Sequence, residues 1–429
     1  MSSREPIEAE GGLRASVSLL KRNHDFRRLY LASLISLGGD WFLLVALFGL
    51  VLKLTGSAIA VAFVLAAQDL TYFLMSPVAG LLADRIDRRM LMVSADLARM
   101  LLVLGFLFVR SEATVWIAFP LLAVIATFSA AFEPASAAAL PNLVEDEDLA
   151  TANALSGSLW GTMLAVGAAL GGLVTAALGR DASIVIDSVS FAASAWLIFR
   201  VRRAFSEERR QETNPGIRQA TAETLRYARK DHRVLALLAV KFGWGVAGGV
   251  LVLIPLLAKH FGAGDIGIGL LMAARGVGAL IGPFVGRASL GPNDRRMFGA
   301  IGVALAVFGL GYALLGLVPG MLLAMPAVAL AHLGGGAQWT LSSYGLQRIV
   351  PDRIRGRIFA FDGMLVTLTF GLSSLLTGWL ADSVGARTTA IGMGGVAVVW
   401  AATWSLLTTD VRRATLLDGC SAAPELEAA

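Results

Sequence analysis

Long apolar runs alternate with short polar or charged segments along the whole chain. A bilayer core about 30 Å thick is crossed by about 20 helical residues, and twelve runs reach roughly that length. The runs are continuous and lack period-two alternation, so they predict helices rather than the strands of a barrel. The predicted spans are 29–52, 58–83, 90–109, 114–138, 151–179, 183–200, 235–258, 265–286, 297–317, 320–345, 358–383 and 388–409.

The composition supports a membrane protein. Hydrophobic residues make up 56% of the 429 residues and charged residues only 16%, too few charges to cover a soluble fold of this size. The first apolar run, from Leu29, is longer than the core of a signal peptide. The sequence therefore predicts an all-α, multi-pass membrane protein and excludes a cytosolic enzyme or a secreted disulfide scaffold.

The basic residues predict the orientation. Of the 36 Lys and Arg, 28 fall in segments that the twelve spans place on one side, five on the other side and three within spans. By the positive-inside rule both termini are cytoplasmic, in the inner (plasma) membrane. The net charge of +5 then reflects orientation and attraction to membrane lipids, so no nucleic-acid partner is expected.

A repeat divides the chain into two halves. A shift of 206 residues places Gly172 on Gly378 and Gly179 on Gly385, and it also aligns several Pro, Leu and Val positions. Six spans per half give both copies the same orientation, related by a pseudo-twofold axis along the membrane normal, with a cavity between them. The predicted divisions are an N-terminal segment (1–28), a first six-helix bundle (29–200), a central loop with an amphipathic helix at 217–230 (201–234), a second six-helix bundle (235–409) and a tail (410–429).

The loop between spans two and three has the sequence Gly80-Leu-Leu-Ala-Asp84-Arg85-Ile-Asp-Arg88-Arg89. It resembles the signature loop of the major facilitator superfamily, and with the twelve spans the resemblance covers nearly the whole chain. Other segments are similar to the branch that contains macrolide and enterobactin exporters. These are Asn23-His-Asp-Phe-Arg27, Gly39-Asp40, Phe132-Glu-Pro-Ala135 running to Leu140-Pro141, Val350-Pro-Asp352 and Arg355-Gly-Arg357.

The resemblance implies the superfamily's fold of two pseudo-symmetric bundles and an alternating-access transporter. It also implies that Gly80, Asp84, Arg85, Arg88 and Arg89 form a gate that braces the outward-open state. Two features depart from the drug–proton antiporters of the superfamily. Span four contains no arginine, and the span-five motif 167–172 lacks its proline.

Charged residues at membrane depth are costly and are candidates for function. Asp40 lies near the middle of span one, where a buried carboxyl group can hold a proton or a cationic substrate. Asp69 of span two aligns with Arg275 of span eight under the 206-residue shift, and the two are candidates for an ion pair across the cavity or for separate local contacts. Glu133, near the end of span four, is a further candidate for proton coupling, substrate contact or bracing of the signature loop.

Other charges are predicted to have structural roles. Asp96 and Arg99 are three residues apart, on one face of span three, and are expected to pair. Lys241 is expected to extend its amine to the membrane surface. Asp187 and Asp362 are expected to lie at the interface.

The sequence contains no phosphate-binding loop, nucleophile elbow or cluster of metal ligands, so no catalytic site, cofactor or metal is expected. We expect a monomeric carrier that exports an amphipathic or cationic small molecule, such as a macrolide-like drug or a siderophore, in exchange for protons. One alternative is a lysophospholipid or lipid flippase of the same superfamily. An alternative of another class is a membrane sensor or assembly subunit that does not transport.

Overall fold

The computed structural model describes residues 9–205, 217–290 and 296–412, and in these segments every regular element is helical. Twelve helical segments are long and apolar enough to cross a membrane, which confirms the predicted fold class. The elements are α1 (Ala9–Arg22), α2 (His24–Thr55), α3 (Ala58–Arg85), α4 (Arg88–Val103), η1 (Leu104–Phe108), η2 (Val115–Ile117), α5 (Ala118–Leu143), α6 (Asp146–Leu178), α7 (Arg180–Phe199), α8 (Ile217–Lys230), α9 (His232–Gly248), η3 (Gly249–Val252), α10 (Leu253–His260), α11 (Gly264–Ser289), α12 (Met297–Leu317), α13 (Met321–Ile349), α14 (Asp352–Val384) and α15 (Ala386–Leu407).

The spans begin and end where local chemistry favours a helix end. The Asn23 side chain accepts a hydrogen bond from the amide of Phe26 at the start of α2, and Gly56 ends that helix in the left-handed conformation. The helix predicted at 217–230 is α8. Two features were missed: α1 within the polar N-terminal segment, and the interruption of span seven by the 3-10 turn η3.

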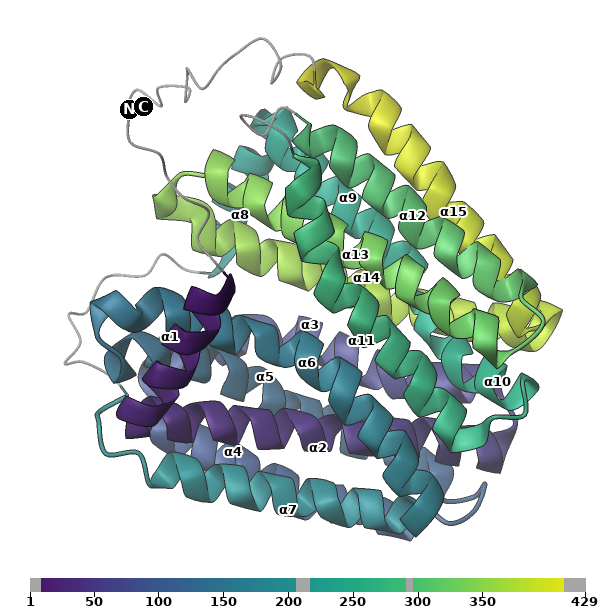
Figure 1. The fold of residues 1–429 in the computed structure, drawn as a ribbon, viewed down its shortest axis with the longest axis horizontal. Helices are drawn as coiled ribbons and strands as arrows, with labels where there is room; N and C mark the ends of the chain where they lie inside the picture. Colours follow the sequence, from purple (N-terminus) through teal and green to yellow (C-terminus); the bar gives the residue numbers. More distant parts are fainter. Residues whose placement is uncertain (1–8, 206–216, 291–295, 413–429) are drawn as a thin grey trace.

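The transmembrane helices form two bundles, α2–α7 and α9–α15 (Figure 1). The 206-residue repeat relates helices of the two halves: α6 and α14 begin and end 206 residues apart, and α3 and α11 begin 206 residues apart. Gly179 and Gly385 both have φ of 86° where one helix ends and the next begins, a conformation that favours glycine. The two halves therefore share one backbone plan.

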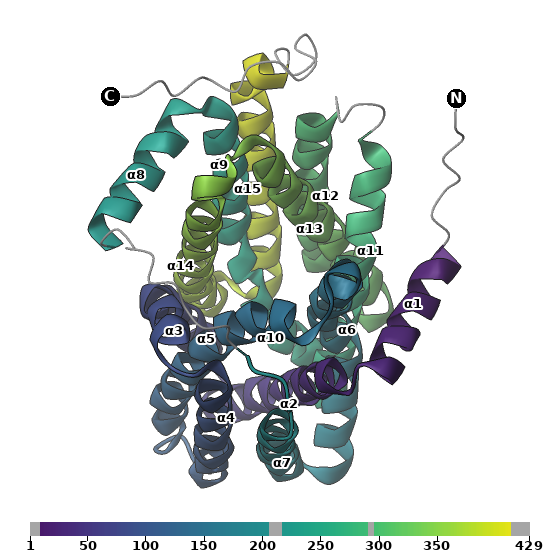
Figure 2. The same ribbon diagram turned by 90° about the vertical axis from the view of Figure 1, so that its left-hand side faces the viewer.

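The end of the molecule that carries α1, α8 and the α3–α4 junction is named the basic end here. Figure 2 looks onto this end and shows α1 beside the first bundle and α8 beside the second. The other end, with the turns at Gly56, Gly179 and Gly385, is named the opposite end.

The bundles touch along two seams, α6 against α11 and α3 against α14. Near the opposite end a Cβ on Gly172 would collide with the backbone of Gly269, and a Cβ on Gly378 with the backbone of Ile59. Further toward the basic end, Gly157 and Gly363 have no atom within 4 Å of such a Cβ. The two halves thus meet over the opposite end and separate toward the basic end.

Polar contacts between the two bundles reinforce their packing at the opposite end. The carboxylate of Asp382 on α14 accepts hydrogen bonds from the hydroxyl of Ser57 at 2.8 Å, the amide of Ala58 at 2.6 Å and the amide of Ile59 at 3.0 Å. This places a negative charge at the N-terminus of α3, where the helix dipole stabilises it. Arg180 of the first bundle pairs with Asp265 of the second at 3.2 Å.

Candidate substrate and proton site

A cavity of 250 Å³ lies between the two bundles. The four candidates for proton coupling or substrate contact all line it: Asp40 of α2, Asp69 of α3, Glu133 of α5 and Arg275 of α11. Most of the remaining wall is apolar, with Leu37, Leu44, Leu47, Leu65, Leu122, Ile125, Trp41, Trp160, Leu251 and Phe370. The cavity thus has three acidic groups on the first bundle and one cation on the second.

Arg275 faces these acids from α11. It is 7% exposed, and its guanidinium carbon lies 5.9 Å from the ring centroid of Trp41 and 5.4 Å from that of Trp160. Such contacts stabilise a desolvated cation. Its Nε has no hydrogen-bond partner, and no ion pair joins it to Asp69 in the described part of the chain. The two residues face one cavity without an ion pair between them in this conformation, and Arg275 has the local contacts that were the second of the two predicted alternatives.

The acidic side of the cavity is supported by a second row of polar groups. The Tyr72 hydroxyl donates to Glu133 at 3.4 Å, and Glu133 is exposed to the open side of the cavity. Behind it, Asp96 and Arg99 of α4 form a buried ion pair. The Arg99 guanidinium also donates to the hydroxyl of Ser129 at 3.3 Å, and it packs over the rings of Phe132 and Phe191.

Asp187 does not lie at the interface as predicted. It is 0% exposed, on α7, with its carboxyl group against Gly39 of α2, one residue before Asp40. The missing side chain of Gly39 creates the space for this carboxyl group. The Gly39-Asp40 pair was a signal in the sequence, but no sequence pattern indicates which helix packs against that glycine.

The predictions for Lys241 and Asp362 were also wrong. Lys241 of α9 is 1% exposed and forms a buried ion pair with Asp362 of α14. Its amine also donates to the Ser343 hydroxyl at 3.0 Å and lies 4.5 Å from the ring centroid of Trp339. An available partner across the bundle removes the reason for the lysine to reach the membrane surface.

Aromatic rings fill the centre of the second bundle. The Trp244 ring lies 5.0 Å from that of Phe370, 5.5 Å from that of Trp339 and 5.9 Å from that of Phe308. Further in, Tyr312 Oη and His332 Nε2 share a buried hydrogen bond of 2.6 Å. His332 is therefore a buried packing residue with a partner.

The candidate gate is only partly described. Gly80, Asp84 and Arg85 belong to the last turns of α3, and their side chains lie outside the described residues. Arg88 donates to the backbone oxygens of Ala138 at 2.8 Å and Phe205 at 3.1 Å. Arg89 donates to the backbone oxygen of Arg203 at 2.7 Å. In this conformation both arginines bind the first bundle's own helix ends and the residues that follow α7.

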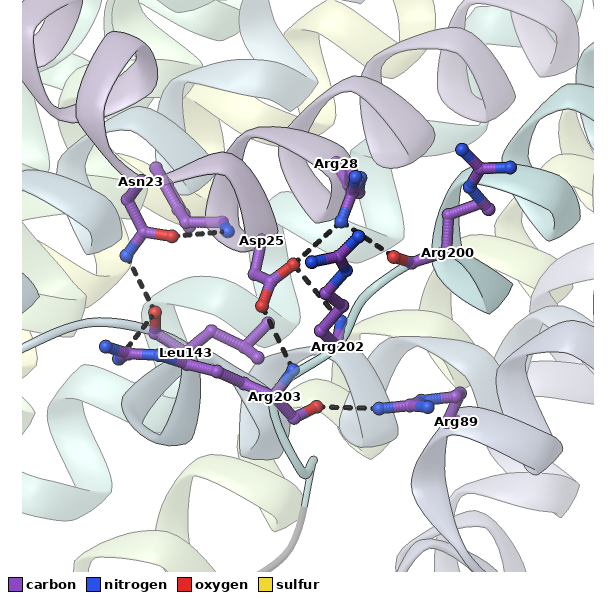
Figure 3. Close-up of polar contacts among 9 residues, drawn as sticks. Asn23, Asp25, Arg28, Arg89, Leu143, Arg200, Arg202 and Arg203 are labelled. Carbon is purple, nitrogen blue, oxygen red and sulfur yellow. Dashed lines mark hydrogen bonds and ion pairs between the residues drawn. The ribbon is translucent and has the colours of Figure 1, made fainter.

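The motif at the start of α2 binds the same segment, as Figure 3 shows. The Asp25 carboxylate accepts hydrogen bonds from the amides of Arg202 at 3.1 Å and Arg203 at 3.0 Å, and from the Arg28 side chain at 3.0 Å. Arg28 also donates to the backbone oxygen of Arg200 at 2.7 Å. Residues 200–205 are thus fixed to the first bundle by the starts of α2 and α4 before the central loop begins.

The comparisons with known proteins agree with this architecture. A family model described as transmembrane secretion effector matches residues 16–424. The chain belongs to this family of the major facilitator superfamily. Its members are transporters rather than enzymes.

Relatives of this chain include proteins named as exporters. Macrolide efflux protein A of Streptococcus pyogenes is 25% identical over 370 residues, which are 84% of this chain and 90% of the relative. The putative bacilysin exporter BacE of Bacillus amyloliquefaciens is 25% identical over 70% of this chain and 75% of its own. The multidrug efflux pump Tap of Mycolicibacterium fortuitum is 26% identical, with coverage of 84% and 90%.

Solved structures confirm the fold. A bacterial homologue of the human lysosomal transporter Spinster, inward-facing and unoccupied, matches 94% of this chain and 99% of its own with a TM-score of 0.74 and 14% identity. An inward-facing bacterial homologue of ferroportin matches 89% and 98% with a TM-score of 0.66 and 16% identity. The chain is an efflux transporter of the major facilitator type and a multi-pass membrane protein.

Proposed function

We propose that this transporter exports an amphipathic, cationic small molecule from the cytoplasm in exchange for protons. The observation that carries the proposal is the cavity, with Asp40, Asp69 and Glu133 on one wall, Arg275 on the other and apolar side chains between them. The leucine and aromatic walls would take the apolar body of the substrate, and the acids its positive charge. A macrolide-like drug has this character, and the names of the relatives support export of such molecules. A siderophore is the second substrate class, with Arg275 as the group that would meet its negative charge.

The basic end is cytoplasmic in this proposal, because the loops with most of the Lys and Arg residues lie there. The described conformation is then inward-facing: the seams are closed on the outer side, and the halves separate toward the cytoplasm. One chain provides the whole cavity, so we take the monomer as the functional unit, surrounded by membrane lipids.

We assign to Asp40 the coupling of proton movement to substrate movement. A carboxyl group between two bundles can hold either a proton or a cationic substrate but not both, so occupancy by one releases the other. Exchange between the two as access alternates is antiport. Asp69 and Glu133 add to the negative potential of the cavity.

The test is export of ethidium in inverted vesicles with an imposed pH gradient. We expect wild-type flux to rise with the gradient, and Asp40→Asn to lower gradient-driven flux by about a hundredfold, within the range that a positioned proton-transfer group contributes. Asp181→Asn is the matched control, because Asp181 is exposed and pairs with Arg110 at the opposite end. Gradient-dependent flux that survives in Asp40→Asn would remove this residue from the mechanism.

Alternating access has its own test in the seams. A Cβ on Gly276 of α11 would collide with the backbone of Ala165 of α6, whereas a Cβ on Gly157 of α6 would meet no atom within 4 Å. Gly276→Ala should disfavour the conformation closed at the opposite end by about 1–3 kcal/mol, the usual cost of overpacking. Gly157→Ala should leave it unchanged.

The readout is thiol labelling at position 62, buried between α3 and α14 near Gly378. Ala62→Cys, in a background with Cys420→Ser, should label about tenfold faster when Gly276→Ala is added, since each 1.4 kcal/mol changes a population ratio by about a factor of ten. If the thiol at position 62 is labelled at the same rate with Gly276→Ala as with Gly157→Ala, the seam between α3 and α14 does not open as proposed.

A further inference from the structure

Asp187 is a buried carboxyl group that the cavity does not use. It lies on α7, behind α2, and is absent from the cavity wall that contains Asp40. Its Oδ1 and the Ser190 hydroxyl occupy the space where a side chain on Gly39 would stand. Asp187 therefore contacts α2 at Gly39 from the side away from the cavity, whereas Asp40, the next residue of α2, lines the cavity.

The carboxyl group has little hydrogen bonding to support a charge. The Ser190 hydroxyl lies 3.3 Å from Oδ1 but only 2.7 Å from the backbone oxygen of Asp187, which is the acceptor it approaches more closely. The other oxygen, Oδ2, is buried without a hydrogen-bond partner among the described residues. A buried carboxylate normally accepts hydrogen bonds from several donors. A buried carboxyl group without such donors is strongly disfavoured in its ionised form.

The surrounding charges do not compensate it either. Asp40 faces it from α2, and Asp96 and Arg99 face it from α4. The other elements packed against α7 are α6 and η1, and neither has a titratable residue between Leu149 and Leu178 or between Leu104 and Phe108. Arg99 is already paired with Asp96. Asp40 and Asp187 thus share a buried region with no cation of their own, where like charges cannot both persist.

We propose that Asp187 is a second proton-binding residue of the transporter, holding its proton as a neutral carboxyl group while the cavity is open at the basic end. The neutral Asp187 allows Asp40 to ionise when a cationic substrate arrives. In that step the O–H bond of Asp40 breaks and its proton passes to water in the cavity, with no oxidation or reduction. The role of Asp187 in transport rests on the proposed antiport. Its bound proton is a property of the protein without substrate and can be measured separately.

The test is infrared spectroscopy of the full-length protein at neutral pH, which detects the carbonyl stretch of protonated carboxyl groups without any substrate. We expect a band that Asp187→Asn abolishes and Asp187→Glu moves to a different frequency. Asp181→Asn, an exposed acid on the same helix, is the matched control and should leave the band in place. Retention of every wild-type band in Asp187→Asn, or an unmoved band in Asp187→Glu, overturns the proposal.

A second measurement separates this inference from the proposed antiport. Proton release on addition of tetraphenylphosphonium to weakly buffered protein should occur in the wild type and persist in Asp187→Asn, because the asparagine is also neutral and the released proton is that of Asp40. Asp40→Asn should abolish the release, and loss of the release in Asp187→Asn would contradict this step. Flux that ignores an imposed pH gradient would refute antiport and leave the infrared band standing. A missing band at Asp187, with flux still driven by the gradient, would refute only the role of Asp187.

Discussion

The interiors of the two bundles differ in charge although their backbones follow one plan. Away from the ends of its helices, the first bundle contains five carboxyl groups, those of Asp40, Asp69, Asp96, Glu133 and Asp187, and one cation, Arg99. The second contains Lys241 paired with Asp362, Arg275 against two tryptophan rings, and His332 bonded to Tyr312. In the first bundle the acidic groups outnumber the cations that could pair with them. In the second bundle each of these groups has a polar partner or packs against aromatic rings.

The difference assigns separate tasks to the halves. A bundle with unpaired acids can gain and lose protons, because its charge state is not fixed by partners. A bundle whose charges are paired keeps the same charge and serves as a rigid wall. We infer that coupling resides in the first bundle, and that the second supplies the aromatic wall and the one cation facing the acids.

The largest expected effect is loss of the buried pair in the second bundle. Lys241→Met leaves Asp362 buried without its partner, which should destabilise the protein by about 3–5 kcal/mol. The measurement is thermal unfolding in detergent. The double variant Lys241→Met/Asp362→Leu should recover most of this loss, since no charge then remains buried. If the single variant unfolds like the wild type, the paired interior is not what stabilises this bundle.

The hydrogen bond between Tyr312 and His332 should have the next largest effect. Tyr312→Phe removes the hydroxyl and leaves a buried ring nitrogen without its 2.6 Å partner, at a cost of about 1–3 kcal/mol. Tyr72→Phe is the comparison in the first bundle, where the 3.4 Å contact to exposed Glu133 should matter much less. Similar unfolding temperatures for the two variants would count against a rigid second bundle.

Asp40→Asn should change stability in the other direction. Removal of this acid should stabilise the protein by about 1–2 kcal/mol at pH 8, because an ionised Asp40 is held between the bundles without a paired cation. The gain should shrink at pH 5, where a proton on Asp40 has the same effect in the wild type. Unfolding curves at both pH values provide the measurement, and a destabilised Asp40→Asn protein at pH 8 would contradict an acidic excess.

The smallest expected effect concerns Arg275. Arg275→Met removes the cation that opposes the acids across the cavity, so a cationic probe such as tetraphenylphosphonium should bind about fivefold more tightly, roughly 1 kcal/mol. Lys259→Met, an exposed lysine at the opposite end, is the control for total charge. Equal affinities in the wild type and Arg275→Met would show that the two walls do not compete for the substrate.

The sequence by itself determined the membrane fold, the twelve spans, the helix at 217–230 and the repeat. These depend on local properties: the length of an apolar run and glycines such as Gly179 and Gly385, whose positive φ is set by the turn they occupy. It also placed Asp40, Asp69, Glu133 and Arg275 at membrane depth, because an acid or arginine within an apolar run cannot avoid that depth.

Only the tertiary structure decided the partners. Asp187 faces Gly39, Lys241 meets Asp362, and Asp69 lies across the cavity from Arg275 without pairing. The rotation of each helix about its axis selects these contacts, and that rotation is fixed by packing against neighbours more than a hundred residues away in the chain. A charged residue within an apolar span thus predicts a buried site. The free-energy cost of burying that charge depends on which side chain the fold brings within a few ångströms of it.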